Sequence, residues 1–336
     1  KSLKASTTYK YRIRAYKTEG KAAQYSAYSA TLSVNTNPSN MSGFKTKSKS
    51  YNSITLQWNK NTSATGYELQ KWDGKKWVSL TKISKNSTTT YTVKNLKAST
   101  TYKYRIRAYK TIGKATQYSG YSATLSVNTN PTNMSGYKVK SKTATSVTLQ
   151  WNKNASATGY ELQKWDGKKW VSLTKISKNS TTTYTVKSLK ASTTYKYRIR
   201  AYKTIGKATQ YSAYTTTLSV NTNPSNMSGF KAKSKSYNSI TLQWNKNTSA
   251  TGYELQKWDG KKWVTLTKIN KNSTTTYTVK GLKASTTYKY RIRAYKTIGK
   301  TTQYSAYTAT LSVNTNPSNM SGFKAKSKSY NSITLQ

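Results

Sequence analysis

The chain has 336 residues, no cysteine and no histidine, and it carries 58 Lys plus Arg against seven Asp plus Glu, giving a net charge of +51 at pH 7. These counts exclude disulfides, thiol catalysis and the usual cysteine or histidine ligands of zinc and haem within this sequence. A surface this basic implies a polyanionic neighbour, such as nucleic acid, an anionic cell-wall polymer, an acidic polysaccharide or an acidic protein.

The sequence repeats itself every 93 residues. Trp58, Trp151 and Trp244 keep that spacing, and the other tryptophans follow the same step. Segments 37–129 and 223–315 differ at only seven positions. We therefore expect three complete repeats, 37–129, 130–222 and 223–315, between the C-terminal part of an earlier repeat at 1–36 and the N-terminal part of a further repeat at 316–336. The sequence is then expected to be a segment of a longer array.

Within one repeat the pattern is that of short β-strands. Apolar and polar residues alternate in segments separated by turn residues at intervals of about 8–12 positions, and no helical period occurs. The expected strands of the first repeat lie at 53–58, 67–70, 77–80, 91–93, 102–109 and 123–127. Alternation places Ile54, Leu56 and Trp58 on one face of the first of these strands, and Tyr67 and Leu69 inward on the second.

The only two acids of the first repeat are each explained without catalysis. Asp73 precedes Gly74 between two strand-like segments, which is a strong signal for a tight hairpin. Glu68 alternates outward from Tyr67 and Leu69, where we expect it to pair across the sheet with Arg105. General acid–base catalysis by carboxylates needs a shared cleft, which this pattern does not provide, so we expect no enzyme and no cofactor.

The segment Leu96-Lys-Ala-Ser-Thr-Thr-Tyr102-Lys-Tyr-Arg-Ile-Arg-Ala108 resembles the corner and sixth strand of fibronectin type III domains. Trp58 is similar to that family's core tryptophan, and Tyr67 to its third-strand tyrosine. The resemblance implies an all-β fold of tandem seven-stranded, immunoglobulin-like antiparallel β-sandwiches arranged end to end. The amino-acid pattern of the repeats is similar to that of repeats in secreted and wall-attached proteins of Gram-positive bacteria. This similarity implies an extracellular or cell-surface location.

Basic and aromatic side chains alternate on one predicted sheet face, where they could hold a polyanion or stack on sugar rings. In each repeat this face combines the sixth strand with the neighbouring hairpin, and a solvated face with a Trp72–Trp77 contact across the hairpin is the alternative. The candidate contacts are Trp72, Lys75, Lys76, Lys103, Arg105, Arg107, Trp165, Lys168, Lys169, Lys196, Arg198, Arg200, Trp258, Lys261, Lys262, Lys289, Arg291 and Arg293.

One tyrosine of the same strand is expected to face outward in every repeat. Tyr109, Tyr202 and Tyr295 are therefore candidates for contacts between parallel rods, because exposed aromatic rings favour protein–protein contact.

Two functions from different classes follow. The first is a non-enzymatic extracellular array that forms the shaft of a bacterial surface fibre, filament or adhesin, with copies of itself and an anionic wall polymer, polysaccharide or acidic protein as partners. The second is a carbohydrate- or polyanion-binding accessory module of a secreted enzyme. No membrane insertion and no sequence-specific nucleic-acid binding are expected, since charge alone does not read sequence.

Overall fold

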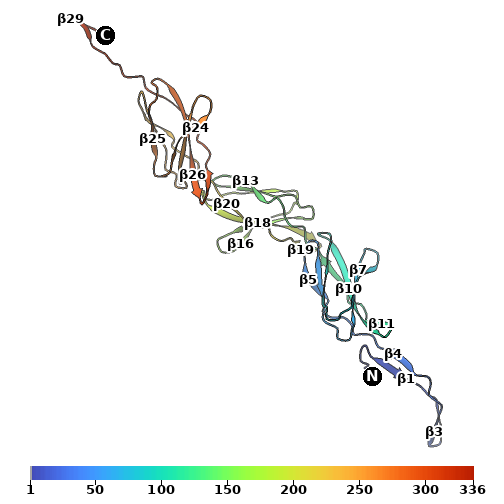
Figure 1. The fold of residues 1–336 in the computed structure, drawn as a ribbon. Helices are drawn as coiled ribbons and strands as arrows, with labels where there is room; N and C mark the ends of the chain where they lie inside the picture. The colour runs from blue at the N-terminus through green and yellow to red at the C-terminus, as the bar shows by residue number, and fades with distance from the viewer. Residues whose placement is uncertain (1) are drawn as a thin grey trace.

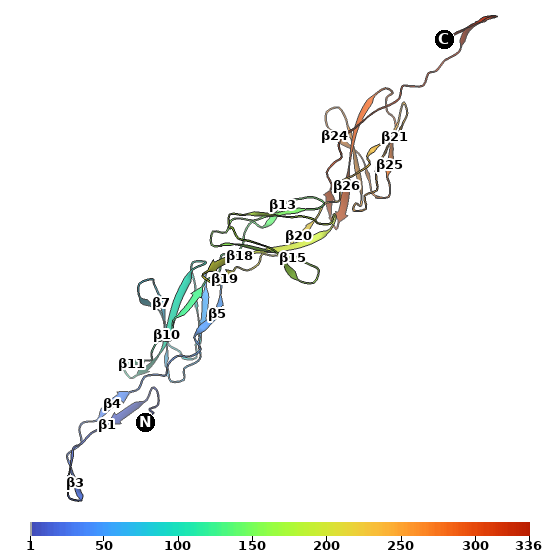
Figure 2. The ribbon, with the colours of Figure 1, turned by 180° about the vertical axis from the view of Figure 1, so that it is seen from behind.

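The computed structural model describes residues 2–336 as three β-sandwiches in a row, with two two-stranded sheets before the first sandwich and one after the third (Figure 1). The view from behind shows the same linear order, with the two termini at opposite ends of an elongated molecule (Figure 2). The described residues contain strands, turns and connecting segments only. None of them forms a helix that is long and apolar enough to cross a membrane.

Each sandwich packs a three-stranded sheet against a larger antiparallel sheet. In repeat 1 the smaller sheet has the order β5 (Lys45–Lys49), β6 (Ile54–Gln57), β9 (Thr90–Val93). The larger sheet has the order β11 (Ala115–Tyr118), β10 (Thr101–Ile112), β7 (Gly66–Trp72), β8 (Trp77–Ile83), and β12 (Leu125–Asn128) also pairs with β10. The last strand of the sandwich is thus split into β11 and β12. The sequence pattern predicted only its second half.

Repeats 2 and 3 have the same strands in the same order. Those of repeat 2 are β13 (Lys138–Lys142), β14 (Val147–Gln150), β15 (Gly159–Trp165), β16 (Trp170–Ile176), β17 (Thr183–Val186), β18 (Thr194–Ile205), β19 (Ala208–Tyr211) and β20 (Leu218–Asn221). Those of repeat 3 are β21 (Lys231–Lys235), β22 (Ile240–Gln243), β23 (Gly252–Trp258), β24 (Trp263–Ile269), β25 (Thr276–Val279), β26 (Thr287–Ile298), β27 (Thr301–Tyr304) and β28 (Leu311–Asn314). The end pieces contain β1 (Thr8–Tyr11), β2 (Tyr16–Glu19), β3 (Ala22–Tyr25), β4 (Leu32–Asn35), β29 (Ala325–Ser329) and β30 (Ser332–Leu335).

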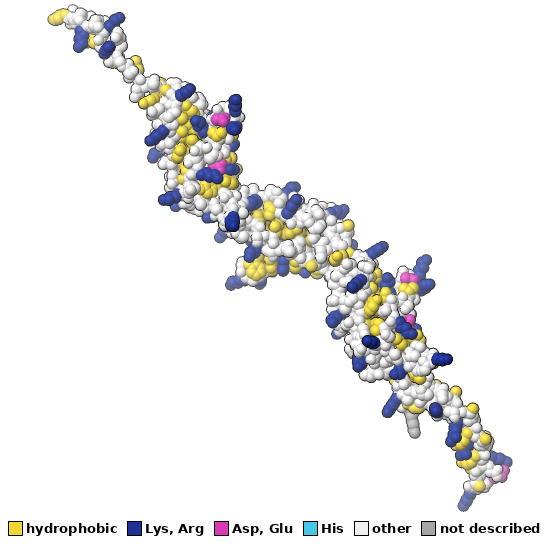
Figure 3. Space-filling view, in the orientation of Figure 1, with side chains coloured by type: hydrophobic (Ala, Val, Ile, Leu, Met, Phe, Trp, Pro, Cys, Tyr) yellow, Lys and Arg dark blue, Asp and Glu magenta, His cyan; other side chains and the backbone are white. Residues whose placement is uncertain are grey.

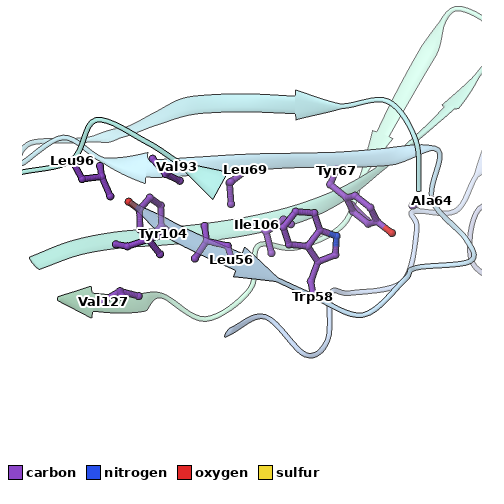
Figure 4. Packing of buried hydrophobic residues seen from close by; sticks show 12 residues of the cluster. Leu56, Trp58, Ala64, Tyr67, Leu69, Val93, Leu96, Tyr104, Ile106 and Val127 are labelled. Carbon is purple, nitrogen blue, oxygen red and sulfur yellow. The ribbon is translucent and has the colours of Figure 1, made fainter. Parts of the chain in front are cut away.

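The core of each repeat consists of the residues that the alternation predicted to point inward. Leu56 and Trp58 from the small sheet meet Tyr67, Leu69 and Ile106 from the large one, and all five are buried (Figure 4). The rings of Trp58 and Tyr67 meet edge to face at 5.4 Å between centroids. Burying such side chains is the main stabilising contribution to a sandwich, at roughly 2 kcal/mol for each large side chain.

Two predicted local structures are confirmed. The Asp73 carboxylate accepts the backbone N–H groups of Lys75 and Lys76, each at 2.8 Å, and Gly74 has a φ of 108° that favours glycine. The hydroxyl of the corner tyrosine Tyr102 accepts the backbone N–H of Lys97 at 2.8 Å. Both interactions recur in repeats 2 and 3.

The buried tyrosine of the third strand provides a direct test of the core. In repeat 2 the Tyr160 hydroxyl donates to the carbonyl of Asn179 at 2.8 Å and accepts the backbone N–H of Asn154 at 2.9 Å. Tyr160→Phe leaves both backbone groups unpaired inside the protein, so we expect it to lower the free energy of unfolding of this repeat by roughly 2 kcal/mol. Urea unfolding followed by tryptophan fluorescence measures the loss. The exposed Tyr237→Phe is the control, and equal stabilities of the two variants would contradict the prediction.

Candidate functional site

The outer face of the large sheet holds a ladder in which arginines and aromatic rings alternate. In repeat 1 the guanidinium carbon of Arg105 lies 4.5 Å from the ring centre of Trp77 and 3.9 Å from that of Tyr121. The guanidinium carbon of Arg107 lies 4.5 Å from the ring of Tyr121 and 3.9 Å from that of Tyr118. We call Trp77, Arg105, Tyr121, Arg107 and Tyr118, with their equivalents in repeats 2 and 3, the arginine ladder. Each such contact contributes about 0.5–2 kcal/mol.

The ladder arginines also bind side chains of β7. Arg105 donates from Nε and Nη2 to the Gln70 side-chain oxygen at 2.9 and 2.7 Å, and Arg107 forms an ion pair with Glu68 at 2.6 Å. The prediction that Glu68 pairs with Arg105 is therefore wrong. The strand register places Arg107 opposite Glu68 and Arg105 opposite Gln70. The carboxylate of Glu68 therefore binds the arginine directly across from it, which is Arg107.

The ladder recurs in the other two repeats. Its guanidinium–ring distances there are between 3.8 and 4.4 Å. The equivalent arginines are Arg198 and Arg200 in repeat 2, and Arg291 and Arg293 in repeat 3. Sequence reasoning picked out these arginines and placed Trp77 only in a contact with Trp72, and it did not place the rings of Tyr118 and Tyr121 beside the arginines. The alternation on β10 was the signal for the arginines, whereas Tyr118 and Tyr121 lie on a segment with no comparable pattern.

The other predicted contact residues lie around the β7–β8 hairpin and its equivalents. Trp72 packs edge to face on Trp77 with 5.5 Å between centroids, Lys75 and Lys76 are exposed in the turn, and Lys103 is exposed on β10. The same placement holds in the other repeats for Trp165, Lys168, Lys169, Lys196, Trp258, Lys261, Lys262 and Lys289. The expected face therefore divides into two parts: the arginines are held in the ladder, while the lysines and the outer tryptophan surround the hairpin.

The outward tyrosine of the same strand is covered. Tyr109 is 4% exposed, and Tyr202 and Tyr295 are 5% and 7% exposed, so the expectation that these rings are available for contact between rods is wrong. The burial of Tyr109 is explained by Gly66, which lies opposite it on the neighbouring strand β7. Because Gly66 has no side chain, the Tyr109 ring has room to lie flat on the sheet. The hydroxyl then donates to the carbonyl of Ile83 at 3.3 Å, and the Lys82 amine covers the ring at 4.4 Å.

A groove lies where the hairpin meets the start of the sixth strand. In repeat 2 it has a volume of about 430 Å³ and is lined by Lys164, Trp165, Asp166, Gly167, Thr194, Tyr195 and Lys196. Two of the predicted contact residues, Trp165 and Lys196, are among these. Lys164 and Tyr195 were not predicted, because their positions alternate with the predicted face.

Positively charged side chains are spread along the molecule and far outnumber acidic ones. On the face shown in Figure 3, Lys and Arg side chains project along the length of the molecule, and acidic side chains are few. No group of three or more metal-ligating side chains occurs in residues 2–336.

Consecutive repeats are joined by a set of contacts that recurs along the chain. Ser99, held at a φ of 52°, donates its hydroxyl to the carbonyl of Ser156 in the next repeat at 2.6 Å and its backbone N–H to the carbonyl of Asn130. The amine of Lys49 donates to the side-chain oxygen of Gln210, which lies on β19 of the next repeat. We call Lys49, Ser99, Asn130, Ser156 and Gln210, with their equivalents, the joint.

The joint between repeats 2 and 3 repeats these contacts. Ser192 donates to the carbonyl of Ser249 at 2.6 Å, and Lys142 donates to Gln303. Burial at the joints lowers the pKa of Lys49 and of Lys142, since it disfavours the charged amine. Lys235, the equivalent position in repeat 3, is exposed. The left-handed φ does not depend on the joint. Ser285 of repeat 3 has a φ of 49° and donates its backbone N–H to the carbonyl of Asn316, so this conformation belongs to the corner of each repeat.

Comparison with known proteins agrees with this architecture. The sequence model of the fibronectin type III domain matches residues 37–124, 129–218 and 223–310. The chain is 31% identical over 281 residues to Exoglucanase B of Cellulomonas fimi, covering 78% of this chain and 24% of that protein. It is 26% identical over 290 residues to Endoglucanase B of Cellulomonas fimi, covering 79% of this chain and 27% of that protein. It thus spans about a quarter of the length of these two relatives. Among solved structures it is similar to the FN1–FN3 domains of chicken CNTN1, with 18% identity, a TM-score of 0.34, and coverage of 83% of this chain and 99% of that one.

The fold therefore defines a class: an all-β tandem array of antiparallel sandwiches placed end to end. The family match covers more than half of the chain, and the chain belongs to the fibronectin type III family.

Proposed function

We propose that this chain is a non-catalytic extracellular spacer, an accessory array that holds other parts of a secreted carbohydrate-active protein at a set distance and rotation. The joint carries the proposal. Its side-chain contacts recur between repeats 1 and 2 and between repeats 2 and 3. No Gly/Ser-rich linker separates the repeats, so the array lacks the segments that make a tether flexible.

The relatives support an accessory role. Two of the proteins that this chain resembles are named as glucanases, and the chain corresponds to only about a quarter of each. We infer that it serves a similar place in a longer protein that acts on or binds a polysaccharide. The carboxylates of each repeat are used in the ladder and in the hairpin turn, which leaves the chemistry to other parts of that protein.

The competing role is the shaft of a surface fibre or adhesin. Such a fibre needs contacts between neighbouring rods, and the tyrosines expected to provide them, Tyr109, Tyr202 and Tyr295, are buried. In addition, a net charge of +51 makes parallel copies repel one another. Both observations favour the accessory spacer.

The role of the joint can be tested by removing its side-chain contacts between repeats 2 and 3. The chain has no cysteine, so Thr183→Cys and Thr276→Cys place one spin label at equivalent exposed sites in repeats 2 and 3. Electron–electron double resonance should give a narrow distance distribution between the two labels. Adding Lys142→Ala and Ser192→Gly removes the Lys142–Gln303 and Ser192–Ser249 contacts, and we expect the distribution to broaden.

The matched control makes the same two changes in repeat 3, at positions that lie outside the joint between repeats 2 and 3. Lys235→Ala with Ser285→Gly alters the equivalent positions of repeat 3, which are exposed, and should leave the distribution narrow. A broad distribution in the otherwise unchanged chain would show that the repeats move independently and would refute the spacer role. Equal broadening by both pairs of substitutions would refute the part given to the joint.

A further inference from the structure

The groove of repeat 2 is lined by two aromatic rings, Trp165 on the outer face of the sheet and Tyr195 on the other face, and both are held in place. In repeat 2 the ring of Trp165 packs edge to face on Trp170 with 5.6 Å between centroids. The ring of Tyr195 stacks on Tyr197 at 6.4 Å, and its hydroxyl accepts the backbone N–H of Lys190 at 2.9 Å. These contacts hold both rings in place before any ligand arrives, which reduces the entropy lost on binding.

The rim of the groove carries two lysines and one carboxylate, so its net charge is positive. The amine of Lys164 lies 5.0 Å from the ring centre of Tyr195, and Lys196 is exposed beside it. The acid of the groove, Asp166, already accepts the backbone N–H groups of Lys168 and Lys169 at 2.8 Å. None of the ion pairs in residues 2–336 includes a lysine of the groove.

The same residues occur at the same place in every complete repeat. The amine–ring distance is 5.7 Å for Lys71 and Tyr102 in repeat 1, and 5.3 Å for Lys257 and Tyr288 in repeat 3. The hairpins of repeats 1 and 3 project to one side of the molecule and that of repeat 2 to the other (Figures 1 and 3). Grooves on alternate repeats therefore lie along the same side of the rod.

We propose that these grooves bind an acidic polysaccharide whose sugar rings carry carboxylates. Sugar rings of the polymer pack on Trp165 and on Tyr195, and their carboxylates pair with Lys196 on the first face and with Lys164, whose amine lies over Tyr195, on the second. A long chain occupies grooves on alternate repeats of one rod, so that weak single contacts add up through effective concentration.

The distribution of cations favours a carboxylate polymer over a nucleic acid. Arginine is the side chain best suited to bidentate phosphate contacts, and both arginines of each repeat are held in the ladder by Gln and Glu side chains. The cations left at the groove are lysines, which act as point charges. Two lysines and two aromatic rings in one groove match a polymer in which each sugar ring carries a single carboxylate.

The test is a titration of the full chain with polygalacturonate, a polymer of carboxylate-bearing sugars, at moderate salt. Lys103→Gln, Lys196→Gln and Lys289→Gln together remove one exposed groove lysine per repeat. The control combines Lys94→Gln, Lys187→Gln and Lys280→Gln, which remove the same charge from exposed positions just after β9, β17 and β25 on the other sheet. We expect the groove variant to lose roughly tenfold in affinity and the control to lose less than about twofold.

A second variant tests the aromatic ring that the hairpin contributes to the groove. Trp72→Leu, Trp165→Leu and Trp258→Leu leave every charge and the core tryptophans in place, and their unfolding midpoint shows whether the repeats still fold. Affinity should fall by a similar factor in the folded protein. If this variant does not fold, the lysine variants alone decide whether the groove binds the polymer.

Three results would overturn the proposal. Equal losses in the groove and control lysine variants would mean that general charge alone binds the polymer. Equal affinity for neutral hydroxyethylcellulose would mean that the groove does not select carboxylates. Tighter binding of single-stranded oligothymidylate with the same dependence on the groove would assign it to nucleic acid. The inference concerns the surface of each repeat and does not rest on the spacer role, so the titration and the spin-label experiment can fail separately.

Discussion

Gly159→Ala should make the middle repeat unfold well before its neighbours. A Cβ atom at this position would lie 1.9 Å from the carbonyl oxygen of Ile176 and 2.9 Å from the hydroxyl of Tyr202. The first of these is backbone in the adjacent strand β16, which cannot move without breaking the pairing of β15 and β16. We expect a loss of roughly 3 kcal/mol in the free energy of unfolding of this repeat. Urea unfolding of the full chain should then show a separate early transition, because each repeat has its own core.

The chain supplies its own control for this substitution. Gly120→Ala makes the same chemical change at a position where repeats 2 and 3 already have Ala213 and Ala306, and the added Cβ meets only the Asn40 side chain, whose Oδ1 lies at 3.3 Å. We expect its unfolding curve to stay close to that of the unchanged chain. A single transition at an unchanged midpoint for Gly159→Ala would show that the β15–β16 contact tolerates a methyl group and would disprove the explanation given for the buried Tyr202.

Glu254→Gln should have the second largest effect on stability. The Glu254 carboxylate is 4% exposed, accepts the hydroxyl of Tyr307 at 2.6 Å and pairs with Arg293 at 3.0 Å. Glutamine keeps the shape but leaves the charge of Arg293 without its partner. Removing one member of a buried pair costs several kcal/mol, and since the Arg293 side chain is 25% exposed we expect about 2 kcal/mol at pH 7.

The effect of Glu254→Gln should depend on pH. Burial raises the pKa of Glu254, but the hydrogen bonds from Tyr307 and Arg293 and the nearby positive charges outweigh it, so that the pKa is lowered below 4.5. A carboxyl group with a lowered pKa stabilises the folded state above the unfolded-state pKa, and this contribution is lost as the pH falls through the folded-state pKa. The difference in stability between the unchanged chain and the variant should therefore shrink between pH 5 and roughly pH 2.

Unfolding midpoints measured across that range test the pH dependence. Glu19→Gln is the matched control, because Glu19 pairs with Lys17 at 2.8 Å on the surface, with both side chains more than half exposed. Exposed ion pairs contribute little to stability, so this variant should show almost no loss at any pH. A loss for Glu254→Gln that stays constant down to low pH would mean that shape, and not charge, determines its effect.

The arginine ladder changes how the charge of this chain is interpreted. Arg105 and Arg107 project from the outer face but are packed between aromatic rings and bound to Gln70 and Glu68. Their charge contributes to the field around the rod, while their donors are largely used within the repeat. The lysines therefore supply the contacts available to an anionic partner.

Much of the fold followed from the sequence by itself. The period of 93 residues, the inward alternation of Leu56 and Trp58, the Asp73-Gly74 turn and the corner tyrosine Tyr102 all depend on residues close together in the chain. Side-chain alternation and turn chemistry are local properties, so a single sequence is sufficient to predict them.

The tertiary structure decided what the outer face can do. Alternation predicted that Tyr109 points outward, but its burial depends on Gly66 in another strand. The partner of Glu68 depends on the register between β7 and β10, which shifts the ion pair from Arg105 to Arg107. Strand register is set by the packing of the whole sheet and not by either strand alone.

The joint was also beyond the reach of sequence reasoning. Its Lys49–Gln210 contact joins side chains 161 residues apart, and neither residue has a local pattern that distinguishes it from the many other lysines and glutamines of the chain. Such contacts arise only once two complete sandwiches are folded and placed end to end. The sequence thus determined the sandwich and its repetition, whereas the tertiary structure determined which outer side chains are available and how one repeat is held against the next.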